Sequence, residues 1–97
     1  WKVKKIVVNP FQSLSLQLHR KRSENWIIVS GTAKVEINEK INYLSQNQSV
    51  FIPINAKHRL SNPNNLPLTI IEVQNGHRID EKDIIRFEDN YGRQDLS

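Results

Sequence analysis

Four side chains that can bind a metal ion stand at two places in this sequence. Gln17, His19 and Glu24 lie close together in the chain, and His58 follows much later. On a β-strand, residues i and i+2 project to the same face, so Gln17 and His19 present their donors together. One amide, two imidazoles and one carboxylate form a mixed nitrogen and oxygen site suited to zinc, manganese, cobalt, nickel or ferrous iron.

Each of these residues also has an ordinary structural role when it is considered alone. A single strand histidine is more often a polar core or surface residue, and a single glutamine is usually a surface hydrogen-bonding residue. Glu24 stands across a short polar connection from the first two donors, where a returning strand can bring it opposite them. The joint spacing of all four therefore favours a metal site over four unrelated residues.

The elements that must position these donors are short β-prone runs separated by turn residues. They cover residues 3–8, 14–19, 26–30, 32–37, 41–44, 49–52, 58–61 and 68–74. Several short strands at regular spacing are typical of an antiparallel sandwich or barrel. Residues 79–88 fit either a weak helix or an edge strand.

Three groups of turn residues predict tight connections between neighbouring antiparallel strands. They are the pair Ser30 and Gly31, residues 38–40, and residues 62–65. No internal repeat or linker interrupts the chain, so residues 1–97 are predicted to form one domain. Because the sequence begins with Trp1 rather than Met, we expect it to be part of a longer polypeptide.

The amino-acid composition limits the kinds of molecule that the protein is expected to bind. The absence of cysteine excludes a disulfide framework and a thiolate metal site, and it fits a cytoplasmic protein. No apolar run is long enough for a membrane span or a signal peptide, so no membrane partner is expected. The net charge of +4 is modest, and no nucleic-acid-reading element is present. Basic residues near a metal site favour an anionic small molecule.

The four donors fall within two motifs that resemble those of the cupin family. The first motif comprises Phe11, Gln17, His19, Glu24 and Gly31, and the second comprises Pro53, Asn55, His58 and Asn62. Phe11, Asn47 and Asn55 stand where the family usually has glycine. Asparagine tolerates a left-handed backbone, whereas phenylalanine does so less easily. The resemblance implies an all-β fold, the cupin-type double-stranded β-helix, which is a jelly-roll barrel of antiparallel strands.

Longer strings extend the resemblance to one group of cupins. Residues 14–19, 22–33, 52–53, 70–76 and 83–93 are similar to the C-terminal domain of type II mannose-6-phosphate isomerases. In that group Gln-x-His replaces the common His-x-His, as at Gln17 and His19. The domain is usually fused behind a mannose-1-phosphate guanylyltransferase domain, whose nucleotide-binding loop these residues lack. The resemblance implies metal-dependent interconversion of mannose 6-phosphate and fructose 6-phosphate, with phosphorylated hexose as substrate.

The resemblance also implies roles for individual residues. A divalent metal ion, zinc or alternatively manganese, cobalt or nickel, would be held by Gln17, His19, Glu24 and His58. Aldose–ketose exchange moves a proton between C1 and C2 through an enediolate, so the site must stabilise negative charge on oxygen. Arg22 is the expected catalytic cation, and the alternative is a rim arginine in solvent. The general base is open among a hydroxide, a carboxylate and a lysine.

Phosphate recognition requires planar donors or point charges. The candidates for substrate binding are Lys57, Arg86 and Arg93. Arg86 has an alternative structural role, which is to pair with Glu88 or Asp89 and fix the C-terminal segment to the barrel.

Two other functions compete with the isomerase. A cupin of this kind could bind a sugar or sugar nucleotide without turnover beside its guanylyltransferase domain, and the isolated domain could then be inactive. An iron-dependent oxygenase is the third hypothesis. The strand at residues 3–8 is a natural sheet edge, which predicts a homodimer.

Overall fold

The computed structural model describes residues 1–76, 79 and 82–87. In this part of the chain the regular secondary structure consists of β-strands. They are β1 (Lys2–Val8), β2 (Gln17–Leu18), β3 (Ser23–Ser30), β4 (Ala33–Ile37), β5 (Lys40–Leu44), β6 (Ser49–Ile52), β7 (His58–Ser61), β8 (Leu68–Asn75) and β9 (Ile85–Arg86). Within the described ranges, no helix is long and apolar enough to cross a bilayer.

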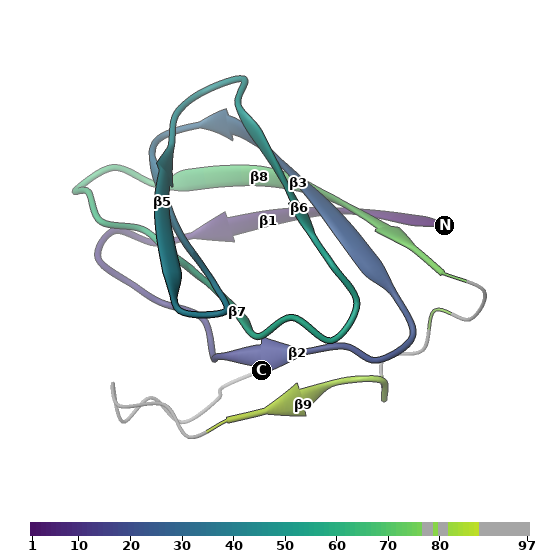
Figure 1. Cartoon of the computed structure of the whole chain (residues 1–97). Coiled ribbons are helices and arrows are strands. Elements are labelled where there is room, and N and C mark those ends of the chain that lie inside the picture. Colours follow the sequence, from purple (N-terminus) through teal and green to yellow (C-terminus); the bar gives the residue numbers. More distant parts are fainter. Residues whose placement is uncertain (77–78, 80–81, 88–97) are drawn as a thin grey trace.

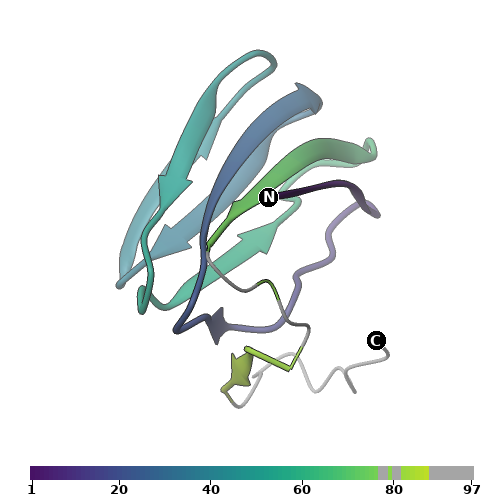
Figure 2. The same cartoon turned by 90° about the vertical axis from the view of Figure 1, so that its right-hand side faces the viewer.

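The strands form two antiparallel sheets that face each other (Figures 1 and 2). One sheet has the order β1-β8-β3-β6, and the other has the order β5-β4-β7-β2-β9. β2 and β9 lie side by side at the lower end of the barrel in Figure 1. This arrangement confirms the prediction of an all-β, antiparallel barrel.

The three expected turns differ in what they connect. Residues 38–40 form the predicted hairpin, because Ile37 pairs with Lys40 across β4 and β5. The prediction of a hairpin at Ser30 and Gly31 is wrong, since β3 and β4 belong to different sheets. Residues 62–65 likewise lead from β7 in one sheet to β8 in the other. Turn residues show where a chain changes direction, but the strand that follows pairs wherever its apolar face is buried.

The interior has a polar end and an apolar end on the same strands. Inward-facing residues of β3 and β8 at the polar end are Glu24, Glu72 and Gln74. Those at the apolar end are Ile28, Leu68 and Ile70, each 0% exposed. Val35, Leu60 and other apolar residues of the second sheet complete the core around the apolar end. Period-two alternation places both kinds of residue inside the same barrel.

The three positions where cupins usually have glycine all adopt a left-handed backbone. Phe11, Asn47 and Asn55 have φ angles of 60°, 72° and 68°. Phe11 is 70% exposed, so its side chain gains little from packing. A non-glycine residue in this region carries a steric cost that asparagine bears better than phenylalanine.

The segment that fitted a helix or an edge strand contains β9 in its described part. Ile85 and Arg86 pair with β2 at the outer edge of the five-stranded sheet. Asp83 anchors the same segment, because its carboxylate accepts hydrogen bonds from the amides of Arg20 and Lys21 at 3.0 and 2.9 Å. Burial opposes ionisation of Asp83, but these two hydrogen bonds, together with the charges of His19 and Arg22, outweigh it, and the pKa lies below its usual value.

Candidate metal centre

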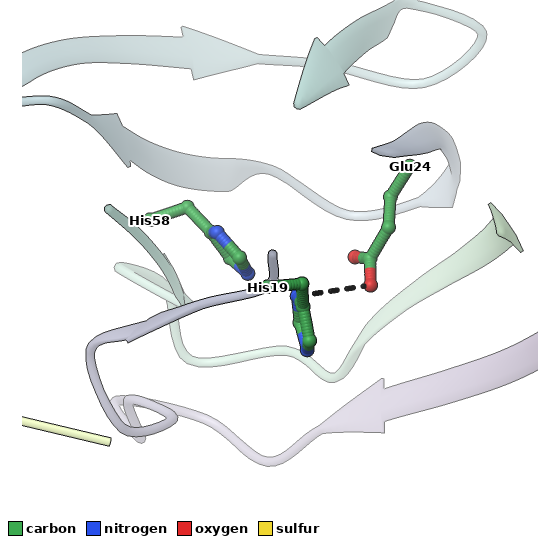
Figure 3. A group of neighbouring side chains, drawn as sticks. All are labelled: His19, Glu24 and His58. Atoms are coloured by element: carbon green, nitrogen blue, oxygen red, sulfur yellow. Dashed lines mark ion pairs between the residues drawn. The ribbon is translucent and has the colours of Figure 1, made fainter. Parts of the chain in front are cut away.

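Three of the four expected metal donors converge in the barrel (Figure 3). His19 follows β2, Glu24 lies on β3, and His58 begins β7. One donor atom from each residue lies within 4.8 Å of the others. All three side chains are buried, with exposed fractions of 4% or less.

Strand pairing explains how residues far apart in sequence meet here. Gln17 and His58 are direct partners in the antiparallel pair β2 and β7. The amide of Asn55 donates to the carbonyl of His19 at 2.8 Å, which ties the loop before β7 to the end of β2. Gln17 lines the same cavity as the three clustered donors, and its Nε2 donates to Ser15 Oγ at 2.8 Å. Gln17 therefore lies beside the cluster.

Both histidines are held in the neutral form that binds metals. Burial and, to a smaller extent, the charges of Arg22 and His58 together lower the pKa of His19 to about 4. Burial also lowers the pKa of His58, whose Nδ1 donates to the carbonyl of Ala56 at 3.0 Å. This hydrogen bond leaves Nε2 of His58 with a free lone pair. Two neutral imidazoles and a buried carboxylate fit a divalent transition metal.

The carboxylate of Glu24 has a partner on each oxygen. Trp26 Nε1 donates to Oε1 at 2.9 Å, and Arg22 Nε donates to Oε2 at 3.1 Å. Arg22 is 6% exposed, so the alternative of a rim arginine in solvent is wrong. Its Nη1 is buried and has no hydrogen-bond partner among the described residues. Arg22 thus stands at the site with one unused donor.

The expected phosphate-binding residues occupy different places. Arg86 lines the cavity from β9 and is paired in register with Gln17. Lys57 is not among the described residues that line the cavity. The ammonium group of Lys57 lies 4.5 Å from the ring centroid of Phe87. Arg93 lies outside the described residues, as do the Glu88 and Asp89 that Arg86 was expected to pair with.

Lys4 and Glu72 also line the cavity, although the sequence did not single them out. They are direct partners across β1 and β8, and both point inward. Burial raises the pKa of Glu72, and so do the charge of Glu24 and a hydrogen bond with it. Gln74 Nε2 donates to Glu72 Oε1 at 2.6 Å. Period-two alternation along β1 and β8 is the signal that could have placed both residues on the inner face.

Comparison with known proteins decides the family. The family model of the mannose-6-phosphate isomerase C-terminal domain matches residues 1–89. The chain belongs to that family. An alginate biosynthesis protein AlgA of Pseudomonas putida is 56% identical over 96% of this chain and 19% of its own length. The mannose-1-phosphate guanylyltransferase ManC of Salmonella typhimurium is 47% identical over the same shares, so this isomerase-family chain spans about a fifth of these relatives.

The fold of this mannose-6-phosphate isomerase-family domain is shared with distant proteins. An uncharacterised protein with a double-stranded β-helix domain from Klebsiella pneumoniae superposes with a TM-score of 0.77 at 17% identity. The match covers 90% of this chain and 74% of the other. The domain therefore has the cupin double-stranded β-helix fold that the motifs predicted.

Proposed function

We propose that this chain interconverts mannose 6-phosphate and fructose 6-phosphate. The observation that carries the proposal is the buried cluster of His19, Glu24 and His58 beside cationic side chains, in a member of this family. Gln17, His19, Glu24 and His58 would hold a divalent ion, which we take to be zinc, with manganese, cobalt or nickel as alternatives. Such an ion supplies Lewis-acid polarisation of the sugar's carbonyl or hydroxyl oxygen.

The remaining steps fall to side chains around the cluster. Arg22 is suited to stabilise negative charge on a substrate oxygen, because its Nη1 is a buried donor without a hydrogen-bond partner among the described residues. Arg86 and Lys4 line the cavity from opposite sheets and are suited to bind the phosphate. Of the three kinds of general base that the sequence left open, the carboxyl is the one for which the described cavity offers a candidate, Glu72, outside the metal donors and the proposed phosphate-binding residues.

A coupled phosphosugar assay tests the reaction. Purified protein should contain about one equivalent of a divalent metal, and its isomerase activity should disappear on chelation and return when the metal is restored. His58→Gln should lower the affinity for the metal ion by at least about 100-fold. Loss of a residue that only hydrogen-bonds to a metal ligand already costs 10- to 100-fold in affinity, and loss of a ligand itself should cost more. Chelator-insensitive activity would contradict the proposal. Bound phosphosugar without turnover would instead support a binding domain.

A matched pair on β1 tests the phosphate contact. Lys4 faces the cavity, whereas Lys5 is its exposed neighbour on the opposite face. Lys4→Met should raise KM for the phosphosugar by about tenfold, in line with the loss of a hydrogen bond to a charged group. Lys5→Met, with the same loss of charge, should leave KM unchanged. Equal effects of the two changes would show that only net charge matters.

We further propose that the chain is the C-terminal part of a cytoplasmic, bifunctional protein. Support comes from relatives named as mannose-1-phosphate guanylyltransferases and as alginate or xanthan biosynthesis proteins, which extend well beyond the matched region. The parent protein would act in GDP-mannose supply for polysaccharide synthesis. Expression of the full parent chain should yield both activities in one polypeptide. A parent chain without guanylyltransferase activity would contradict this assignment.

A homodimer through β1 is the proposed assembly. β1 is an edge strand, and on its outer face Val3 and Val7 are 50% and 52% exposed. Sedimentation velocity should give the mass of a dimer at micromolar concentrations, and Val3→Lys together with Val7→Lys should convert it to a monomer. A monomer mass for the unmodified chain over a wide concentration range would exclude this assembly.

A further inference from the structure

Arg22 contacts two of the three clustered donors at once. Its Nε donates to Glu24 Oε2 at 3.1 Å, and its Nη2 lies 2.8 Å from His19 Nε2. A guanidinium group only donates hydrogen bonds, so Nε2 of His19 is the acceptor. A neutral imidazole has one N–H and one lone pair, and the proton of His19 must therefore be on Nδ1. That atom lies 3.5 Å from Glu24 Oε2.

This hydrogen bond cannot coexist with a metal ion on His19. If the ion binds Nε2, it takes the lone pair that Arg22 uses. If the ion binds Nδ1, the proton moves to Nε2, which then becomes a donor facing a second donor. Either nitrogen gives the same result, so the conclusion does not depend on which one faces the metal.

We propose that Arg22 and the metal ion are mutually exclusive partners of His19, and that metal binding releases the guanidinium from His19 toward the cavity. The inference rests on the proposed metal site and adds a coupling to it. Arg22 lies in the connection between β2 and β3, lines the cavity, and carries a second buried donor, Nη1, without a partner among the described residues. Metal occupancy would thus make a buried cationic donor available to an anionic substrate, and Arg22 would set the metal affinity.

Zinc titration of metal-stripped protein tests the competition directly. Arg22→Met should bind zinc about 10- to 100-fold more tightly than the unmodified chain, because the metal no longer displaces a charge-assisted hydrogen bond. The matched control is Arg20→Met, which removes the same charge from an exposed position of the same connection. Its affinity should equal that of the unmodified chain. If both substitutions increase the zinc affinity equally, the increase comes from the change in net charge, and the inference is overturned.

The unmodified chain provides a second measurement, in case Arg22→Met removes the charged partner of Glu24 Oε2 and destabilises the fold. Nitrogen-15 NMR should show His19 protonated on Nδ1 before zinc is added, with slow exchange of the Arg22 guanidinium protons. One equivalent of zinc should abolish that protection. Retention of the Arg22–His19 hydrogen bond in the zinc-bound protein would overturn the inference.

The two proposals fail in different ways. If unmodified chain and Arg22→Met both bind zinc with the same affinity, the metal site stands and only the competition is wrong. If neither binds zinc, the proposed metal site is wrong and the competition is wrong with it. Binding by Arg22→Met alone would support the competition in its strongest form.

Discussion

The polar end and the apolar end of the barrel interior use the same strands for opposite purposes. At the apolar end, Ile28 and Ile70 are fully buried, and each such side chain contributes about 1.5–3 kcal/mol by leaving water. At the polar end, Glu24 and Glu72 are also buried, which costs free energy unless each charge or polar group has a partner. The comparison indicates that burial of apolar side chains stabilises one end, whereas the other end contains the candidate metal centre.

At the polar end, the hydrogen-bond donors to the buried Glu24 carboxylate lie close to it in the sequence. Arg22 and Trp26 both bind the Glu24 carboxylate, and both stand two positions from it in the chain. The apolar end depends instead on contacts between different strands and both sheets. A substitution at the apolar end should therefore act on the whole fold, whereas one at the polar end should act mainly on the site.

The largest expected effect is from Ile70→Ala. Removing this fully buried side chain should destabilise the fold by about 2–5 kcal/mol. Ile71→Ala is the matched control, because Ile71 is the half-buried neighbour on the outer face of β8, and it should cost less than about 1 kcal/mol. Urea denaturation measures both. The zinc affinity of folded Ile70→Ala should be unchanged, and a large loss of affinity would contradict the separation of the two ends.

Gly76→Ala tests whether a shift of the backbone at the polar end changes the metal site. A Cβ at this position would collide with the Lys21 carbonyl and lie 3.2 Å from Arg22 Cα, so the connection that carries Arg22 must move. We expect a loss of about 1–3 kcal/mol and a changed zinc affinity. Gly31→Ala is the control, because its Cβ would lie 2.9 Å from Pro67 O and its φ is +94°. Gly31→Ala should destabilise the fold by a similar amount but leave the zinc affinity unchanged. A changed zinc affinity in both variants would contradict the separation of the polar end from the apolar end.

Asp83→Asn should produce a smaller, pH-dependent effect at the β9 segment. Because the folded pKa of Asp83 is lowered, its contribution is complete above the unfolded pKa and is lost as pH falls through the folded pKa. The variant should be less stable by about 1 kcal/mol at pH 7, the net value of a hydrogen bond, and the difference should shrink in acid. Denaturation curves from pH 7 to pH 3 measure it. A constant difference would exclude the carboxylate charge as its source.

Phe11→Gly should have the smallest effect, and it should be stabilising. Phe11 has a φ of 60° and an exposed side chain, so glycine relieves backbone strain while little packing is lost. The strain relieved is about 1–2 kcal/mol, and glycine's greater freedom in the unfolded chain cancels part of it. We expect a gain of about 0.5 kcal/mol in thermal or urea unfolding. Because Phe11 belongs to neither end, zinc affinity should stay the same.

The sequence predicted much of the fold because strand patterns are local. Residues 49–52 and 58–61 match β6 and β7 at both ends, and the β4–β5 hairpin follows from its turn residues. The β2 strand is shorter than residues 14–19 suggested, because only Gln17 and Leu18 have ladder partners. The hairpin predicted at Ser30 and Gly31 is wrong because turn residues do not indicate which strand will pair with the strand that follows them; β3 and β4 belong to different sheets.

The sequence by itself determined the donor types, their spacing and the barrel that could gather them. Period two fixed which residues share a strand face, and the motif intervals fixed where the turns fall. Only the tertiary structure decided that Arg22 is buried against His19 and Glu24, that Lys57 lies outside the cavity, and that Lys4 and Glu72 line it. These outcomes depend on which sheet each strand joins, and pairing between strands distant in sequence is set by the burial of the whole interior rather than by local pattern.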